Sequence, residues 1–225
     1  MSVLEVNDLS KKYLFQNKEI MVLNHVNQTF DKGKIYNIVG HSGSGKTTLL
    51  RILGTLLDCD SGEVDIDGKN LSIMKEKEKA RLRNQKIGFV FQDYLLNDKL
   101  KSYENVMIPM LINKNIIPKK RKERAIILLE KVRLTDRINH YPKEMSGGEQ
   151  QRVAIARALA NNPDIILADE PTGNLDKENE KIILDIFQEL KKEGKCIVIA
   201  SHSEYVKKYA DVILHIEDGH LEVIR

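Results

Sequence analysis

The sequence predicts an α/β fold with a mainly parallel sheet, an N-terminal antiparallel β subdomain and an inserted α-helical subdomain. Three observations lead to this fold class. Short apolar runs alternate with stretches of helical spacing in the outer parts of the chain. One apolar run leads through a glycine-rich turn at residues 40–45 directly into a helix. From about residue 93 to residue 162 the apolar spacing is helical and strand signals fade.

Five strand candidates precede the helical stretch. They span residues 3–6, 22–30, 35–39, 62–68 and 87–91. The fourth alternates apolar and acidic side chains between two glycines, which is typical of a half-exposed strand. The third and fifth are largely apolar, which indicates buried strands. Residues 48–53, between the third and fourth strands, have helical spacing.

The second half of the chain predicts helices followed by further strands. The helices open at residues 119–122 and cover residues 153–160 and 179–193, and the strands cover residues 165–168, 196–200 and 212–216. The last strand pair turns at Asp218-Gly219. Strands that alternate with helices predict a parallel sheet with crossover helices. We expect one domain, 1–225, in which residues 1–92 and 163–225 form the core with the β subdomain and residues 93–162 form the helical subdomain.

The composition limits the class of protein only broadly. Charged residues make up 31% of the chain and leave a formal net charge of +3, which by itself says little about nucleic acid. No nucleic-acid partner is expected. Cys59 and Cys196 lie far apart, without metal-ligand spacing. No apolar run approaches the ~20 residues that span a bilayer, and the first residues lack a secretory pattern. We expect a cytoplasmic chain without a further C-terminal domain, for which another chain supplies any membrane channel.

Residues 40–47 match the phosphate-binding loop pattern G-x-x-x-x-G-K-[S/T]. They are Gly40, His41, Ser42, Gly43, Ser44, Gly45, Lys46 and Thr47. Glycines allow the backbone to curl so that successive N–H groups point inward, and the helix start adds partial positive charge. In this pattern Lys46 reaches the β- and γ-phosphates, and the Thr47 hydroxyl binds Mg²⁺. The sequence therefore predicts a P-loop NTPase core.

Two adjacent acids follow the apolar run at residues 165–168. In a phosphate-loop enzyme the first acid, here Asp169, holds Mg²⁺, and the second, here Glu170, orients or deprotonates the attacking water. Buried strands seldom end in paired carboxylates for packing reasons alone. An Asp-Glu pair by itself also resembles a helix cap, so the interpretation depends on the phosphate loop and the strand before the pair.

A second glycine turn, Ser146-Gly147-Gly148, precedes a clear helix. A serine hydroxyl and bare glycine backbone at a helix N-terminus predict a second anion site. Together with the phosphate loop and the acidic pair, residues 145–152 resemble the signature of the nucleotide-binding subunit of ATP-binding cassette (ABC) transporters. The resemblance covers nearly the whole chain. The family usually has leucine where this chain has Met145, and apolar anchoring is preserved.

The resemblance implies a role for each residue that matches the family motifs. Residues 40–48, which end at Thr48, bind the ATP phosphates, and His41 occupies a variable position of that loop. Lys46, Glu170 and His202 are the implied catalytic residues, and His202 is the switch that contacts the γ-phosphate.

Two further implied positions lie outside the phosphate loop. Tyr13 matches the aromatic residue that stacks on adenine, with Val22 as an apolar neighbour, and Phe15 is a competing candidate for Tyr13. Gln92 matches the glutamine that senses Mg²⁺ and links to the helical subdomain, so Thr47, Gln92 and Asp169 are the implied magnesium ligands.

The resemblance also implies contacts between two copies of the chain. The signature residues Ser146, Gly147, Gly148, Glu149 and Gln150 contact the ATP bound to the other copy. Asp176 matches a loop that crosses the dimer interface. We expect a homodimer, because one chain supplies one phosphate loop and one signature. The two copies would enclose two MgATP, and opening and closing of this dimer would drive a partner.

The partner implied by the resemblance is an integral membrane permease, with this subunit on the inner face of the membrane. Gly173-Asn174 and the extended signature look most like a bacterial branch of lipoprotein-release, macrolide-efflux and antimicrobial-peptide export or resistance systems. A cell-division ATPase that transmits force through a permease-like partner and a soluble ABC ATPase of translation or DNA repair are the alternatives. A phosphate-loop kinase or GTPase would leave the signature turn and His202 unexplained.

Overall fold

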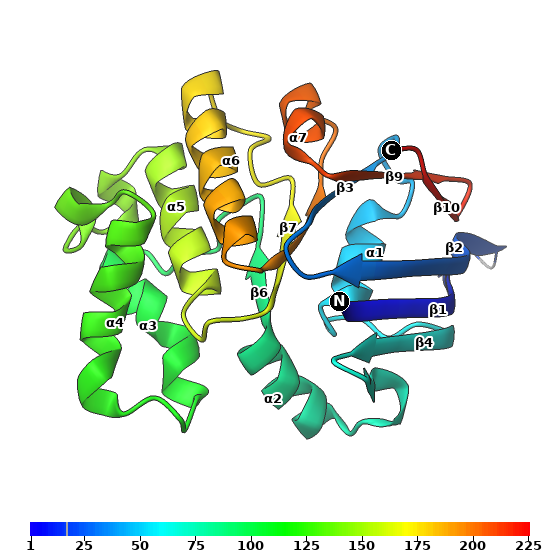
Figure 1. The fold of residues 1–225 in the computed structure, drawn as a ribbon, viewed down its shortest axis with the longest axis horizontal. Helices are drawn as coiled ribbons and strands as arrows, with labels where there is room; N and C mark the ends of the chain where they lie inside the picture. Colours follow the sequence, from blue (N-terminus) through cyan, green and yellow to red (C-terminus); the bar gives the residue numbers. More distant parts are fainter. Residues whose placement is uncertain (17) are drawn as a thin grey trace.

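A six-stranded sheet runs through the centre of the protein, as a computed structural model describing residues 1–16 and 18–225 shows (Figure 1). Its strand order is β10 (His220–Val223), β9 (Val212–Glu217), β3 (Ile35–Val39), β8 (Cys196–Ala200), β7 (Ile165–Asp169) and β6 (Ile87–Val90). All neighbouring pairs are parallel except β9 and β10. Parallel strands buried on both faces need continuous apolar runs, and every residue of β3 and β8 is buried.

A second, antiparallel sheet is formed by the N-terminal part of the chain. Its order is β2 (Lys18–Asp31), β1 (Ser2–Phe15), β4 (Ser61–Ile66) and β5 (Lys69–Asn70). The first two strands are longer than the predicted residues 3–6 and 22–30. Beyond Leu9, cross-strand pairs such as Tyr13 with Ile20 continue the ribbon although its side chains are largely exposed. This part of the ribbon is held by strand pairing rather than by burial, so its sequence does not show the apolar pattern that predicts a strand.

Helix α1 (Lys46–Leu53) lies between the two sheets, and five other helices lie on the opposite face of the six-stranded sheet or beyond it (Figure 1). These are α3 (Ser102–Ile112), α4 (Pro118–Lys131), α5 (Gly147–Ala158), α6 (Lys177–Lys192) and α7 (Glu204–Tyr209). In Figure 1, α3, α4 and α5 gather on the side of the molecule away from β1, β2 and β4. Within residues 1–16 and 18–225, no helix is both long and apolar enough to cross a membrane.

Two hydrophobic cores result from the alternation of side chains along the central strands. Tyr36 and Ile38 pack with α1 and the antiparallel sheet, whereas Ile35 and Val39 face the core of α5, α6 and α7. The predicted fold class, a P-loop NTPase core with an antiparallel β subdomain and inserted helices, is confirmed. Within the predicted helical stretch the first helix begins only at Ser102, and the three-residue turns η2 (Thr135–Arg137) and η3 (Pro142–Glu144) separate α4 from α5.

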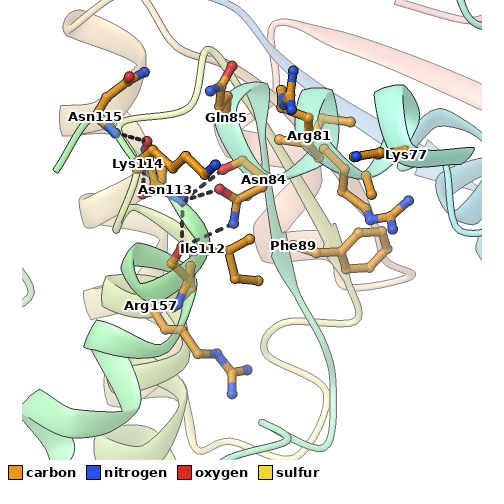
Figure 2. A pocket seen from close by; sticks show the side chains of 17 residues that line it. Lys77, Arg81, Asn84, Gln85, Phe89, Ile112, Asn113, Lys114, Asn115 and Arg157 are labelled. Atoms are coloured by element: carbon orange, nitrogen blue, oxygen red, sulfur yellow. Dashed lines mark hydrogen bonds between the residues drawn. The ribbon is translucent and has the colours of Figure 1, made fainter.

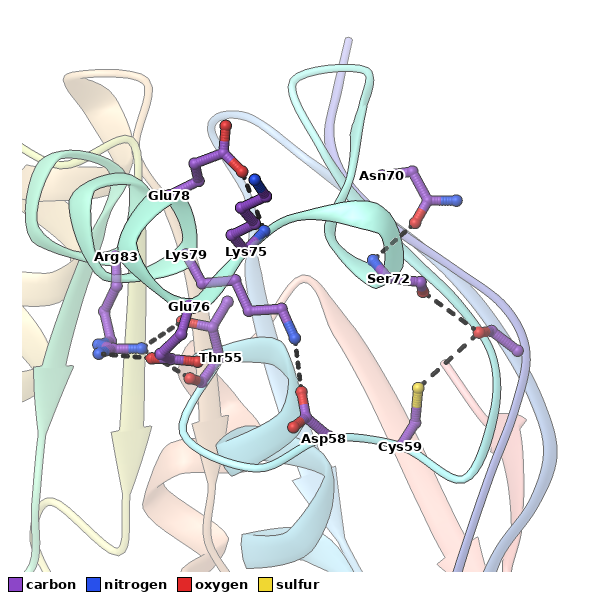
Figure 3. Close-up of polar contacts among 11 residues, drawn as sticks. Thr55, Asp58, Cys59, Asn70, Ser72, Lys75, Glu76, Glu78, Lys79 and Arg83 are labelled. Carbon is purple, nitrogen blue, oxygen red and sulfur yellow. Dashed lines mark hydrogen bonds and ion pairs between the residues drawn. The ribbon is translucent and has the colours of Figure 1, made fainter.

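Helix α2 (Glu76–Lys86) was not predicted, because it has no apolar face and none of its residues is buried. Leu82 packs against the core from this helix, and polar contacts attach the rest (Figure 3). Glu78 accepts a hydrogen bond from the Lys75 backbone at 2.9 Å, which caps the helix after the turn η1 (Leu71–Ile73). The Lys79 ammonium lies 2.6 Å from Asp58, and Arg83 donates to the Thr55 backbone and hydroxyl at 2.7 and 2.8 Å. These contacts attach α2 to the segment between α1 and β4.

Asn37 carries the only side-chain amide of β3, and it is fully buried on the face that Ile35 and Val39 share. Neither its amide nitrogen nor its amide oxygen has a hydrogen-bond partner among the described residues. An unpartnered buried polar group costs about 1–3 kcal/mol. Asn105, which is equally buried, donates to the carbonyls of Asn97, Leu100 and Lys101.

We expect Asn37→Val to raise the free energy of unfolding by about 1 kcal/mol, because it removes two unsatisfied groups from the core. Such a gain shifts the melting temperature by roughly 2–4 °C in a chain of this size. Asn105→Val, the matched control, should lower the melting temperature because it removes the partners of the Leu100 carbonyl and of the Asn97 backbone N–H. Differential scanning calorimetry of both variants measures the two melting temperatures. A lower melting temperature for Asn37→Val would contradict the inference that the Asn37 amide is unpaired in the core.

Candidate functional site

The site lies where the parallel strands β3, β8, β7 and β6 end, at one edge of the central sheet. The register pairs Ala168 with Val90 and Asp169 with Ala200, so these carboxyl ends are level with one another. Gly40 follows β3, Ser201 follows β8 and Glu170 follows β7. Ligands of open α/β sheets bind at such an edge. The structure thus brings the predicted phosphate loop, acidic pair, Gln92 and His202 to one edge.

The phosphate loop turns tightly between β3 and α1. A Cβ built on Gly40 would lie 2.5 Å from the carbonyl oxygen of Ile216, so this position has no room for a side chain. Gly43 has a left-handed φ of +80°. The Lys46 ammonium donates to the carbonyl oxygens of Gly40 and His41 at 2.8 and 3.0 Å, which holds its charge at the loop. The loop therefore presents a cation together with a helix N-terminus, as a polyphosphate requires.

Side chains around the loop add polar and apolar surface. Ser44 is buried, and its hydroxyl has no partner among the described residues. His41 is exposed and its ring lies 2.8 Å from the carbonyl oxygen of Ser42. Val22 lies against the loop, since a Cβ on Gly45 would meet its carbonyl oxygen at 2.8 Å. Tyr13 lies on the same ribbon, with a 41% exposed ring that Lys11 approaches to 5.8 Å.

Thr47 and Asp169 connect the phosphate loop to the acidic pair. The Thr47 hydroxyl donates to an Asp169 carboxylate oxygen at 3.1 Å. Burial raises the pKa of Asp169, and the hydrogen bond from Thr47 acts in the opposite direction. A hydroxyl and a partly desolvated carboxylate are oxygen donors of the kind that Mg²⁺ prefers, together with substrate phosphates and water. These residues fit the predicted magnesium site.

Glu170 is held by contacts from the strand beside it. Its backbone N–H donates to Ala200 at 2.9 Å, and one carboxylate oxygen accepts from the Ser201 hydroxyl at 3.0 Å. The other carboxylate oxygen lies 2.9 Å from Nδ1 of His202. The Glu170 side chain is 17% exposed, whereas His202 is 80% exposed. A largely buried carboxylate and a solvent-accessible imidazole are therefore in direct contact at this edge of the sheet.

Gln92 follows β6 on the far side of β7, and its side chain is exposed. Its amide nitrogen lies 3.5 Å from the position that a Cβ of Gly173 would take. Gln92 therefore lies against the loop that follows Glu170. No described contact joins the Gln92 amide to Thr47 or Asp169, so its place among the magnesium ligands stays a prediction.

The signature turn is the N-terminus of α5, on the helical side of the molecule. Ser146 caps the helix: its hydroxyl accepts from the Glu149 backbone at 3.3 Å, and Glu149 accepts from the Ser146 backbone at 2.8 Å. Burial opposes ionisation of Glu149, but hydrogen bonds from Ser146 and Arg137 outweigh it and lower its pKa. The Gln150 amide donates to the Met145 carbonyl at 3.1 Å, and Met145 is buried as predicted.

Asp176 caps α6 within its own chain. Its two carboxylate oxygens accept from the backbone and the side-chain amide of Asn179 at 2.8 and 2.9 Å. The backbone hydrogen bond from Asn179 is the main cause that lowers the pKa of Asp176. Asn179 also accepts from Arg152 at 3.1 Å, and a Cβ on Gly148 would lie 2.4 Å from its Cγ. The Asp176 loop and the signature helix are thus packed together, and the predicted role of Asp176 across a dimer stays a prediction.

A comparison with known protein families identifies this arrangement. Residues 23–173 match the family described as ABC transporter. The chain belongs to the ABC transporter family. It is 48% identical over 201 residues to the lipoprotein-releasing system ATP-binding protein LolD of Bacteroides thetaiotaomicron, which covers 89% of this chain and 92% of that protein. It is 45% identical over 219 residues to the uncharacterized ABC transporter ATP-binding protein YvrO of Bacillus subtilis, with 97% and 95% covered.

Solved structures agree with this family. The fold matches the ATP-binding cassette MJ0796, in a dimeric post-hydrolysis state with ADP and Pi, with a TM-score of 0.90, 37% identity and 99% of both chains covered. A second dimeric structure of MJ0796 also matches with a TM-score of 0.90, at 38% identity and 99% coverage of both chains. This ABC protein is therefore an ATP-binding, ATP-hydrolysing subunit of a transporter.

Several polar residues of the site were not predicted. Ser201 is buried and holds Glu170, and its place between a buried strand and His202 was a usable signal. Thr172 and Ser203 both donate to Glu180, at 3.1 and 2.6 Å, which joins the loops after β7 and β8. Gln151 and Arg157 donate from α5 to backbone carbonyls, for which the sequence has no signal.

We expect Gly40→Ala to destabilise the protein more than Gly43→Ala. The second change imposes only the left-handed backbone, which costs about 1–2 kcal/mol, since no described atom lies within 4 Å of the new Cβ. The first adds a collision with the Ile216 carbonyl and displaces the loop. Urea denaturation and titration with a fluorescent ATP analogue measure both effects. Equal losses of stability and affinity in the two variants would contradict the close approach at Gly40.

Proposed function

We propose that this subunit hydrolyses ATP with Glu170 as the residue that orients or deprotonates the attacking water and His202 as the contact to the γ-phosphate. The observation that supports this most is the Ser201–Glu170–His202 set beside the phosphate loop. Lys46 neutralises charge on the β- and γ-phosphates, while Gly40 to Thr48 cradle them. Tyr13 and Val22 flank the adenine.

Thr47 and Asp169, with Gln92, would hold Mg²⁺. Bound there, Mg²⁺ neutralises phosphate charge as it develops. The chain's own contribution is to fix the oxygen donors: Asp169 stays against Thr47 at 3.1 Å, at the level of Ala200 in the sheet. The buried carboxyl gains most from a nearby cation, because a positive charge offsets its desolvation.

The active form is, on this proposal, a dimer of two such chains around two ATP molecules. Each chain has one phosphate loop, between the sheets, and one signature turn, at the start of α5. The signature residues Ser146, Gly147, Gly148, Glu149 and Gln150 then contact the ATP held by the partner, and the Asp176 loop lies at the interface. The dimeric state of the MJ0796 structures supports this arrangement.

We expect Glu170→Gln to lower kcat for ATP by about 10²–10⁴-fold, the contribution of a general base, without abolishing ATP binding. Slow hydrolysis should leave the dimer trapped with MgATP, which size-exclusion chromatography with light scattering detects. Glu178→Gln, an exposed acid in the first turn of α6, is the matched control and should behave as the parent protein. A Glu170→Gln protein that hydrolyses ATP at the parental rate, or stays monomeric with saturating MgATP, would refute the assignment.

The transporter to which this subunit belongs is proposed to be of the lipoprotein-release, macrolide-efflux or antimicrobial-peptide type, with the subunit on the inner face of the membrane through an integral permease. The 48% identity to a protein named LolD supports this branch.

A groove of about 860 Å³ beside the site offers a docking surface for that permease (Figure 2). It is lined by α2, β6, α3 and the end of α5, and it includes apolar side chains such as Phe89 and Ile112. Asn161 connects the segments that line the groove. Its side-chain amide donates to the carbonyl oxygens of Pro109 and Asn84, and its amide oxygen accepts from the Asn113 side chain. Phe89, which lines the groove, lies three residues before Gln92, so a segment seated there lies close to Gln92.

The side chains that line the groove are positively charged or neutral, which limits the kind of segment that can bind there. The cationic lining residues are Lys77, Arg81, Arg83, Lys114 and Arg157, and no acidic side chain lines it within the described part of the chain. Complementary potentials favour a permease segment that combines an apolar face with acidic residues.

We expect the double variant Lys77→Glu, Arg81→Glu to recover much less permease than the parent in a pull-down from native membranes with MgATP. Reversing two charges replaces attraction by repulsion at the groove. Its ATPase rate should be unchanged, because neither residue is at the sheet edge. Lys192→Glu, an exposed lysine at the end of α6, is the control. Full recovery of permease by the double variant contradicts docking at this groove, and recovery of ribosomal or DNA-associated proteins alone contradicts the transporter partner.

A further inference from the structure

The segments that follow β6 and β7 leave the sheet in unusual backbone conformations. Tyr94 and Leu95 have left-handed φ values of 58° and 49°, and Glu170 has a φ of 43°. Residues other than glycine hold such values only where the surroundings fix them. Contacts with other parts of the protein therefore hold these two segments, which contain Gln92 and Glu170, in their conformations.

Gln151 of α5 contacts both segments through one buried amide. Its Nε2 donates to the carbonyl oxygen of Pro171 at 2.8 Å and to that of Phe91 at 3.3 Å. Phe91 immediately precedes Gln92, and Pro171 immediately follows Glu170. The Gln151 side chain is completely buried, so water does not compete for these bonds.

A second side chain of α5 also forms hydrogen bonds to the segment that follows β6. Arg157 donates to the carbonyl oxygens of Tyr94 and Leu95, the two residues with left-handed backbone. Gly147, at the signature turn, completes the contact, because a Cβ there would lie 2.8 Å from the Tyr94 hydroxyl. Among the α5 side chains that the structure describes, Gln151 is the one that donates hydrogen bonds to both segments.

We propose that Gln151 is a positioning residue that fixes Gln92 and Glu170 relative to each other and couples both to the signature helix. The proposal rests on the roles given to Gln92 and Glu170 under the proposed function. A side-chain amide suits this task because its NH₂ group carries two donors, one for each carbonyl. Gln151 lies on the second turn of the helix that Ser146 caps, so a shift of the signature turn moves both segments together.

The test is Gln151→Met, which keeps the length of the side chain and removes both donors. Gln188→Met is the matched control: Gln188 lies on α6, and its amide donates to the Tyr209 carbonyl at 2.9 Å. We expect faster backbone hydrogen exchange in residues 91–95 and in residues 172–175 of Gln151→Met, measured without nucleotide. The control should show faster exchange only near Tyr209.

Steady-state kinetics supply the second readout. We expect kcat of Gln151→Met to fall by roughly 10²-fold, the effect of a misplaced reacting group, while KM for ATP stays within about threefold. Gln188→Met should keep both constants. Unchanged exchange in the two segments, or an unchanged kcat, overturns the proposal. A parental rate in Glu170→Gln would instead overturn the proposed function without altering the exchange result, so the two can fail separately.

A second variant covers the case in which Gln151→Met does not fold. Gln151→Glu offers one O–H donor when its carboxyl is protonated and none when it is ionised. We expect its kcat, divided by that of the parent, to fall as pH rises, at pH values where circular dichroism shows the variant folded. A ratio that does not change with pH overturns the proposal.

Discussion

Parallel pairing of β3, β8, β7 and β6 is the constraint on which the site depends. Strands that run in one direction release their next residues at one edge, so the phosphate loop, Glu170 and His202 meet there although they are distant in sequence. Burial on both faces of the sheet fixes the register, because a shift by one residue would move every side chain to the other core. The geometry of the polar site is thus set by apolar packing beneath it.

The edge itself is stabilised by polar contacts of a different kind. Asp169 reaches across to Thr47, Glu170 to Ser201, and Thr172 to Glu180, so each loop is tied to a neighbouring element. Helix α5 extends this network away from the sheet. Its N-terminus displays the signature turn, and its buried face supplies donors to the loops after β6 and β7. The phosphate loop and the signature turn therefore lie in different layers but are connected by one network of hydrogen bonds.

The predictable part of the fold is the part where burial repeats in sequence. Residues 35–39 and 196–200 were predicted with the observed bounds because both strands are buried on both faces. The outer half of β1 was not predicted because its side chains are largely exposed and strand pairing holds it. Helix α2 was not predicted because none of its residues is fully buried and its apolar residues form no periodic face. Helix α7, six residues long with one buried residue, likewise lacks a periodic face.

The site divides along a similar line. Motif positions were predictable because phosphate binding demands particular residue types: Gly40 where no Cβ fits, and a lysine and a hydroxyl next to the helix start. The roles of Gln151 and Arg157 could not be predicted, because both side chains donate to backbone carbonyls. Every residue has a backbone carbonyl, so the residue type of the acceptor gives no information about such a bond. Only the folded structure shows which side chain donates to which carbonyl. Residues that position a site through the main chain are therefore the ones for which a structure is required.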